Sequence, residues 1–157
     1  MESKILYVEP HKCTGCGRCE LACSFEHEQQ YNSLLSRIRV VYFEDISLGI
    51  PTSCTECEEK ACMDVCPSGA IKMTKNDITV VDENICIGCK QCVFVCPFGA
   101  ISFIKEKKVA IKCDLCDGDP ECVKNCPTGA IQYLQLDRAV MKKKREYLLD
   151  LVKKGGI

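Results

Sequence analysis

The fold of this chain is decided by the stretch Cys86-Ile-Gly-Cys89-Lys-Gln-Cys92-Val-Phe-Val-Cys96-Pro97-Phe-Gly-Ala-Ile101. Three cysteines follow one another at intervals of three residues, and a fourth comes four residues later, directly before a proline. A cubane of four irons and four sulfides needs one thiolate at each iron, and this spacing lets one short loop supply three of them. The fourth cysteine of such a run ligates the other cluster in two-cluster proteins. The stretch therefore predicts a partner stretch elsewhere in the chain.

Four such groups of cysteines occur, and together they use all 16 cysteines of the chain. Groups one and three share the even spacing, whereas groups two and four have a longer gap between their second and third cysteines. The segment Pro-x-Gly-Ala-Ile follows three of the groups, and Ser24 replaces the proline after the first. Repetition of this kind indicates repeated supersecondary units. The candidate iron ligands are Cys13, Cys16, Cys19 and Cys23; Cys54, Cys57, Cys62 and Cys66; Cys86, Cys89, Cys92 and Cys96; and Cys113, Cys116, Cys122 and Cys126.

Disulfides and zinc are the competing uses of so many cysteines. Disulfides are typical of secreted chains, but residues 1–10 show no signal peptide and no apolar run is long enough to span a membrane. We therefore expect a reducing, cytoplasmic compartment in which thiols bind metal. Structural zinc sites commonly pair two separated Cys-x-x-Cys units, which groups one and three do not resemble. The spacing favours iron–sulfur clusters over both alternatives.

The rest of the composition predicts a small core and no catalytic site. The chain has no Trp, five Phe and five Tyr, so metal is expected to supply much of its stability. Its 21 Lys and Arg nearly balance its 22 Asp and Glu. Oxidised clusters with their thiolates are anionic, so the basic residues are expected to neutralise cofactor charge rather than bind nucleic acid. No Ser–His–Asp set, phosphate-binding loop or pair of carboxylates stands out.

Between the cysteine groups, the pattern of apolar residues predicts short strands and few helices. The tail is expected to form a helix of about 15 residues with one apolar stripe, which packs either on the chain's own core or on a catalytic subunit. The stripe consists of Val140, Tyr147, Leu148, Leu151 and Val152. The basic run 142–145 is expected either on a solvated face or as a docking element. His11 and His27 are expected at the surface or as caps rather than as ligands. The predicted strands are 4–8, 36–43, 71–74, 78–81, 101–104, 109–111 and 131–134, and the predicted shorter helices are 24–30 and 93–95.

The second group carries a more specific resemblance. Pro51-Thr-Ser-Cys54-Thr-Glu-Cys57-Glu-Glu-Lys-Ala-Cys62-Met-Asp-Val-Cys66-Pro67-Ser-Gly-Ala70 resembles the second cysteine group of the four-cluster iron–sulfur subunits of formate dehydrogenases, dimethyl sulfoxide reductases and related complexes. The other groups follow in that family's order, so the likeness spans roughly residues 4 to 135. It implies an α+β fold of two nested ferredoxin-like units, with strand 4–8 beside strand 131–134. The outer unit is residues 1–50 plus 105–157, including the C-terminal helix, and the inner unit is residues 51–104.

The resemblance also implies how the ligands are shared. Each site takes three cysteines from one group and the last cysteine of another, and because no cysteine is replaced, four [4Fe–4S] clusters are implied. The implied sets are Cys13, Cys16, Cys19 with Cys126; Cys113, Cys116, Cys122 with Cys23; Cys54, Cys57, Cys62 with Cys96; and Cys86, Cys89, Cys92 with Cys66.

The implied function is electron transfer in anaerobic metabolism, not catalysis. Residues 11–43 resemble the compact soluble members that accompany tungsten aldehyde oxidoreductases, carbon monoxide dehydrogenase and class II benzoyl-CoA reductase. The first expectation is a subunit that passes single electrons between a tungsten or molybdenum aldehyde oxidoreductase subunit and a second redox protein. Two alternatives stay open: a free polyferredoxin that shuttles electrons between enzymes, or a subunit of a carbon monoxide dehydrogenase, hydrogenase or benzoyl-CoA reductase complex.

Overall fold

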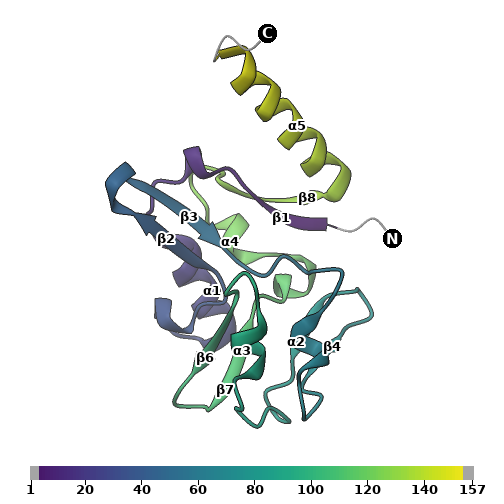
Figure 1. The fold of residues 1–157 in the computed structure, drawn as a ribbon. Coiled ribbons are helices and arrows are strands. Elements are labelled where there is room, and N and C mark those ends of the chain that lie inside the picture. The colour runs from purple at the N-terminus through teal and green to yellow at the C-terminus, as the bar shows by residue number, and fades with distance from the viewer. Residues whose placement is uncertain (1–3, 154–157) are drawn as a thin grey trace.

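Short hairpins alternate with cysteine loops along the computed structural model, which describes residues 4–153 (Figure 1). Those residues form four two-stranded antiparallel sheets and five α-helices, which is the α+β class expected from the sequence. The strands are β1 (Lys4–Val8), β2 (Arg39–Phe43), β3 (Leu48–Thr52), β4 (Ile71–Met73), β5 (Thr79–Val81), β6 (Ile101–Ile104), β7 (Val109–Lys112) and β8 (Ile131–Gln135). The helices are α1 (Arg18–Glu28), α2 (Ala61–Asp64), α3 (Gln91–Val95), α4 (Glu121–Lys124) and α5 (Leu136–Lys153).

The first and last strands lie side by side. Lys4 is opposite Gln135 and Val8 is opposite Ile131 in the antiparallel β1–β8 register. The pairing continues beyond the strand, because the N–H of Glu9 donates to the carbonyl oxygen of Ala130 at 2.8 Å. The expected contact between strands 4–8 and 131–134 is thus confirmed, and the three hairpins lie between these two strands in the sequence.

Several small buried clusters, rather than one large core, hold the elements together. Isoleucines in or next to the strands and cysteines in the helices make up most of these clusters. A core built in this way has few apolar side chains of its own, so groups bound by the cysteines would form part of the packing. The clusters that contain buried cysteines are Cys19, Cys23, Ile38, Cys122 and Ile131; Ile71, Cys92, Ile101 and Ala110; and Ile78, Cys113 and Leu115.

Only one strand of the β2–β3 hairpin is predicted from the sequence. A strand was predicted over residues 36–43, and β2 occupies its second part, but its partner β3 was missed. β3 contains Gly49 and lies in register with Pro51 opposite Val40. In a two-stranded sheet both strands are edges, which is where a strand tolerates proline.

Helix α5 contacts the body of the chain mainly through polar side chains, and its predicted apolar stripe takes no part in this contact. Its first turns lie against β1, where Ala139 is buried, Lys142 pairs with Glu9, and the Tyr7 hydroxyl donates to Glu146 Oε2 at 2.6 Å. The rest of α5 projects away from the body of the molecule (Figure 1).

Helix α5 forms as predicted, but the placed members of the apolar stripe do not pack on the described body of the chain. Val140, Tyr147 and Leu148 are exposed, and the side chains of Leu151 and Val152 lie outside the described residues. Over residues 4–153, neither α5 nor any other helix combines the length and apolar character needed to cross a membrane.

Candidate metal centres

Each Cys-x-x-Cys loop turns sharply at the residue before its second cysteine. The backbone angle φ at this position is positive in all four loops: 69° at Gly15, 48° at Glu56, 68° at Gly88 and 57° at Leu115. A side chain on Gly88 would collide with the carbonyl oxygen of Lys108, so that loop requires glycine. The turn also aims backbone donors at sulfur, because the N–H of Gly15 lies 3.4 Å from Cys13 Sγ. Donors of this kind favour thiolate ligands.

Cysteines from two different groups surround one cavity of about 250 Å³. Three come from the second group, including Cys62 on α2, and the fourth is Cys96, which directly follows α3. All 16 cysteines are free thiols in this structure. Four thiols around one cavity match the donor set of a [4Fe–4S] cubane. The cysteines lining the cavity are Cys54, Cys57, Cys62 and Cys96.

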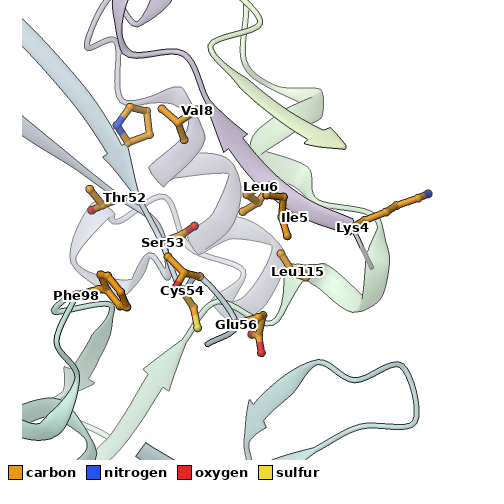
Figure 2. A pocket seen from close by; sticks show the side chains of 12 residues that line it. Lys4, Ile5, Leu6, Val8, Thr52, Ser53, Cys54, Glu56, Phe98 and Leu115 are labelled. Atoms are coloured by element: carbon orange, nitrogen blue, oxygen red, sulfur yellow. The ribbon is translucent and has the colours of Figure 1, made fainter. Parts of the chain in front are cut away.

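A second cavity, of about 330 Å³, lies between β1, the end of β3 and the Cys54 loop (Figure 2). Figure 2 shows Ile5, Leu6 and Leu115 together on one side and Phe98 on the other. Among the described residues that line it, Cys54 is the single cysteine. This cavity is too poor in thiols for a cubane, and its lining is otherwise largely apolar.

The fourth group of cysteines gathers around Cys23 of the first group. Burial raises the pKa of the Cys122 thiol, and the neighbouring sulfurs of Cys113, Cys23 and Cys116 raise that pKa further. Burial also raises the pKa of Cys113 to about 12. These thiols would be protonated without metal, so metal binding there must release protons.

The remaining groups also have a cysteine from another group nearby. Burial raises the pKa of Cys92 to about 11, with contributions from the sulfurs of Cys86 and Cys66. Cys66 belongs to the second group and packs against the same buried cluster as Cys92. Cys126 of the fourth group packs against the buried cluster that contains Cys19. The structure thus brings cysteines together across groups, while the ligand sets themselves stay a prediction.

His27 takes the expected cap position in the last turn of α1, with Nδ1 2.9 Å from the carbonyl oxygen of Cys23, but its side chain is not at the surface. Its side chain is 10% exposed, with Nε2 3.0 Å from Asp114 Oδ1 and Nδ1 4.0 Å from Cys23 Sγ. Burial lowers the pKa of His27, but the hydrogen bonds to Asp114 and Cys23 outweigh it and raise the pKa to about 10. His11 is exposed, as expected.

Arg37 connects the same region to the inner hairpins. Its backbone N–H donates to Cys23 Sγ at 3.3 Å, and its guanidinium lies 2.6 Å from Asp114 Oδ2 and 3.4 Å from Glu83 Oε1. Positive groups therefore lie close to Cys23, where a bound cluster would bring negative charge.

Sequence reasoning missed the buried lysine at the end of β7. The side chain of Lys112 is 1% exposed. Its ammonium donates to Glu56 Oε1 at 2.7 Å, to the carbonyl oxygen of Cys113 at 2.7 Å, and to the carbonyl oxygen of Thr79. The available signal was a single charge following the apolar run 109–111, directly before a cysteine group.

Comparison with known families identifies the cysteine groups as iron–sulfur domains. Residues 47–136 match a 4Fe-4S dicluster domain, and a separate match to a 4Fe-4S dicluster domain covers residues 12–71. Two dicluster domains imply four [4Fe–4S] clusters, for which 16 cysteines supply four ligands each.

The relatives of this chain include several redox proteins. Electron transport protein HydN of Escherichia coli is 34% identical over 95 residues, which cover 56% of this chain and 53% of HydN. The polyferredoxin-like subunit of the aliphatic sulfonate oxidoreductase of Pyrococcus furiosus is 38% identical over 86 residues, covering 54% of this chain and 49% of that subunit. One polypeptide of the anaerobic dimethyl sulfoxide reductase of E. coli is 34% identical over 102 residues, covering 54% of this chain and 47% of that polypeptide. The matched region spans about half the length of these relatives.

Solved structures support the fold over nearly the whole chain. One polypeptide of the active site complex BamBC of benzoyl coenzyme A reductase superposes with a TM-score of 0.50 at 24% identity, covering 98% of this chain and 96% of that polypeptide. At this level of identity the likeness concerns the fold alone.

Proposed function

Because the chain belongs to the family of 4Fe-4S dicluster domain proteins, we propose that it is an electron-transfer subunit of an oxidoreductase complex and has no catalytic site of its own. A [4Fe–4S] cluster supplies reversible one-electron chemistry with a potential set by charge, hydrogen bonds to sulfur and exposure. The residues of the chain would bind the clusters and hold charged groups at defined positions beside them.

The observation that carries this proposal is the cavity shared by Cys54, Cys57, Cys62 and Cys96. If all four cysteines of the second group bound one cluster, the fourth ligand in this cavity would be Cys66. Cys66 instead lies near Cys92 of the third group. We extend the same crossed arrangement to all four sites. The proposed ligand sets are Cys54, Cys57, Cys62 and Cys96; Cys86, Cys89, Cys92 and Cys66; Cys13, Cys16, Cys19 and Cys126; and Cys113, Cys116, Cys122 and Cys23.

The proposed sets divide the chain into the two nested units. The inner unit, residues 51–104, would hold the two sites made by groups two and three, and the outer unit, residues 1–50 plus 105–157, the other two. The β1–β8 pairing supports an outer unit built from both parts of the chain. The division after residue 104 falls in the turn between β6 and β7, and the division after residue 50 falls within β3.

A partner protein is supported by apolar side chains left at the surface beside the third cysteine group. Ile87, Phe94 and Phe98 are exposed, and Phe94 reaches 85% exposure. Cys89 lies in the same stretch and is itself exposed. Apolar groups of this size at the surface mark interaction sites, and an exposed ligand is where an electron would enter or leave.

The proposed partners are a catalytic subunit with a tungsten or molybdenum site, of the aldehyde oxidoreductase type, and a second redox protein. The relative named as a polyferredoxin-like subunit of an aliphatic sulfonate oxidoreductase supports a role of this kind. Relatives named for dimethyl sulfoxide reductase and hydrogenase support the same electron-transfer role with other catalytic partners.

Anaerobic affinity purification of the full chain, followed by mass spectrometric identification of bound proteins, tests the proposal. We expect a metal-containing oxidoreductase subunit to be recovered with the intact chain in stoichiometric amount. If α5 is the docking element, a chain truncated after Asp137 should no longer recover that subunit. Truncated protein should keep its four clusters. Isolation of the intact protein alone, with reduction of its clusters by several unrelated enzymes, would indicate a free polyferredoxin instead.

A further inference from the structure

Lys112 lies where the two proposed units meet. Its side chain lines the cavity of the Cys54 site, and its ammonium donates to the carbonyl oxygen of Cys113, the first ligand of the neighbouring site. Cys54 packs against the buried cluster that contains Cys113, so the two sites adjoin. One buried positive charge is therefore placed beside two proposed cluster sites, one from each unit.

Glu56 holds that charge in position at a cost to the backbone. It occupies the left-handed conformation that Gly15 and Gly88 supply in their loops, and a residue other than glycine is disfavoured there. Both carboxylate oxygens are used: Oε1 accepts from Lys112, and Oε2 accepts from the N–H of Thr79 at 3.0 Å. Leu115 adopts the same conformation in the fourth loop, so what distinguishes Glu56 is that both of its carboxylate oxygens are used, one of them by the buried lysine.

Stability alone is a weak explanation for this ion pair. Burying two charges costs solvation free energy, and apolar replacements of buried ion pairs are often neutral or stabilising. Lys112 also lines the same cavity as Cys54 and Cys62, so its charge lies beside the sulfurs of that site.

We propose that the Lys112–Glu56 pair sets the potentials of the two clusters on either side of the junction between the inner and outer units. This inference rests on the proposed function, because it presupposes that both sites hold clusters. When an electron crosses the junction, one site is oxidised by one electron and the other is reduced by one, and no proton or bond is exchanged. Lys112 stabilises the reduced form of either site, and Glu56 opposes it, because Coulomb interactions are strong away from water.

The test compares variants of the intact protein with its clusters in place. Lys112→Met removes the positive charge and Glu56→Gln removes the negative charge while keeping the shape of the side chain. Lys72→Met is the matched control, because Lys72 also pairs with a carboxylate, that of Asp82, but at the exposed surface. Iron and acid-labile sulfide are counted first, and then the four midpoint potentials are measured by redox titration with electron paramagnetic resonance.

The pair predicts shifts of opposite sign. Two of the four potentials should become more negative in Lys112→Met and more positive in Glu56→Gln, while the other two, and all four in Lys72→Met, stay unchanged. Shifts of the same sign in both variants, or no shift larger than that of Lys72→Met, would overturn the inference. If Lys112→Met fails to assemble its clusters, Glu56→Gln decides alone, because an unshifted pair of potentials in that variant contradicts the proposal. Wild-type protein without four clusters would refute the proposed function itself.

Discussion

Cys96 is the residue that shows whether a cluster takes its fourth ligand from another cysteine group or all four ligands from one group. Its sulfur lines the cavity with Cys54, Cys57 and Cys62, although it belongs to the group of Cys86. We expect Cys96→Ala to lose the cluster of the Cys54 site, about four of 16 irons, or to convert it to a three-iron cluster, about one iron fewer. The cluster of the Cys86 site should stay intact. Iron analysis with cluster-resolved electron paramagnetic resonance measures both. Damage confined to the Cys86 site would show that each group closes on its own cluster.

Arg37 is expected to hold the region around Cys23 together. Its guanidinium pairs with Asp114 and Glu83 and approaches Glu28, whose side chain is largely buried. Arg37→Met would leave buried carboxylates with fewer positive partners, at a cost of about 2 to 3 kcal/mol. If the whole cost lowers the barrier to unfolding, absorption of the clusters should be lost in urea on the order of 30- to 160-fold faster.

Lys124→Met is the control for that experiment. Lys124 pairs with Asp119 and Glu121 at the exposed surface, where ion pairs contribute little. Cluster loss as slow in Arg37→Met as in Lys124→Met would mean that the charges around Arg37 do not contribute to stability.

At the scale of elements, Glu9 determines how α5 is attached and how the attachment depends on pH. Burial raises the pKa of Glu9, but hydrogen bonds from Lys142 and Lys12 outweigh it and lower the pKa from 4.5 to about 2. The ionised carboxylate therefore stabilises the folded state fully above pH 4.5, and this contribution is lost as the pH falls from 4.5 toward 2.

Hydrogen exchange in peptides from α5 measures that attachment. At neutral pH, Glu9→Gln should raise the exchange rate of the first turns of α5 on the order of fivefold, as expected for loss of a charge-assisted hydrogen bond. The difference in exchange rate between Glu9→Gln and wild type, corrected for intrinsic exchange, should shrink once the pH falls below the ordinary range of a carboxyl group. Lys143→Met, one residue beyond Lys142, serves as the control. Equal protection in Glu9→Gln and wild type would contradict this attachment.

The elements that could be predicted from sequence are those specified by local pattern. Cysteine spacing and the repeated Pro-x-Gly-Ala-Ile segment locate the loops and the strands that follow them, and apolar runs locate the β4–β5 and β6–β7 hairpins. β3 was missed because Gly49 and Pro51 are unfavourable in strands. Only the structure shows that this segment pairs with β2.

The burial of charged residues could not be predicted, because it depends on partners far away in the chain. His27 and Asp114 are separated by 87 positions, and Lys112 and Glu56 by 56. No local pattern distinguishes such residues from charges at the surface. The ligand groups at the candidate sites were therefore accessible from sequence, but the charged residues beside them were not.

At the scale of the whole molecule, the fold is expected to depend on its clusters. The buried clusters of side chains are small and contain cysteines that would bind iron. Removal of iron by a chelator, or exposure to air, should therefore abolish most of the circular dichroism of the folded chain. A spectrum unchanged after all iron has been removed would show that the apolar residues alone maintain the fold.

The count of iron and acid-labile sulfide in anaerobically purified protein tests the central claim most directly. Four [4Fe–4S] clusters predict about 16 irons and about 16 sulfides per chain, with all iron in a single class of cubane by Mössbauer spectroscopy. Stoichiometric zinc without acid-labile sulfide would contradict the claim, and so would iron sufficient for only two clusters after complete reconstitution.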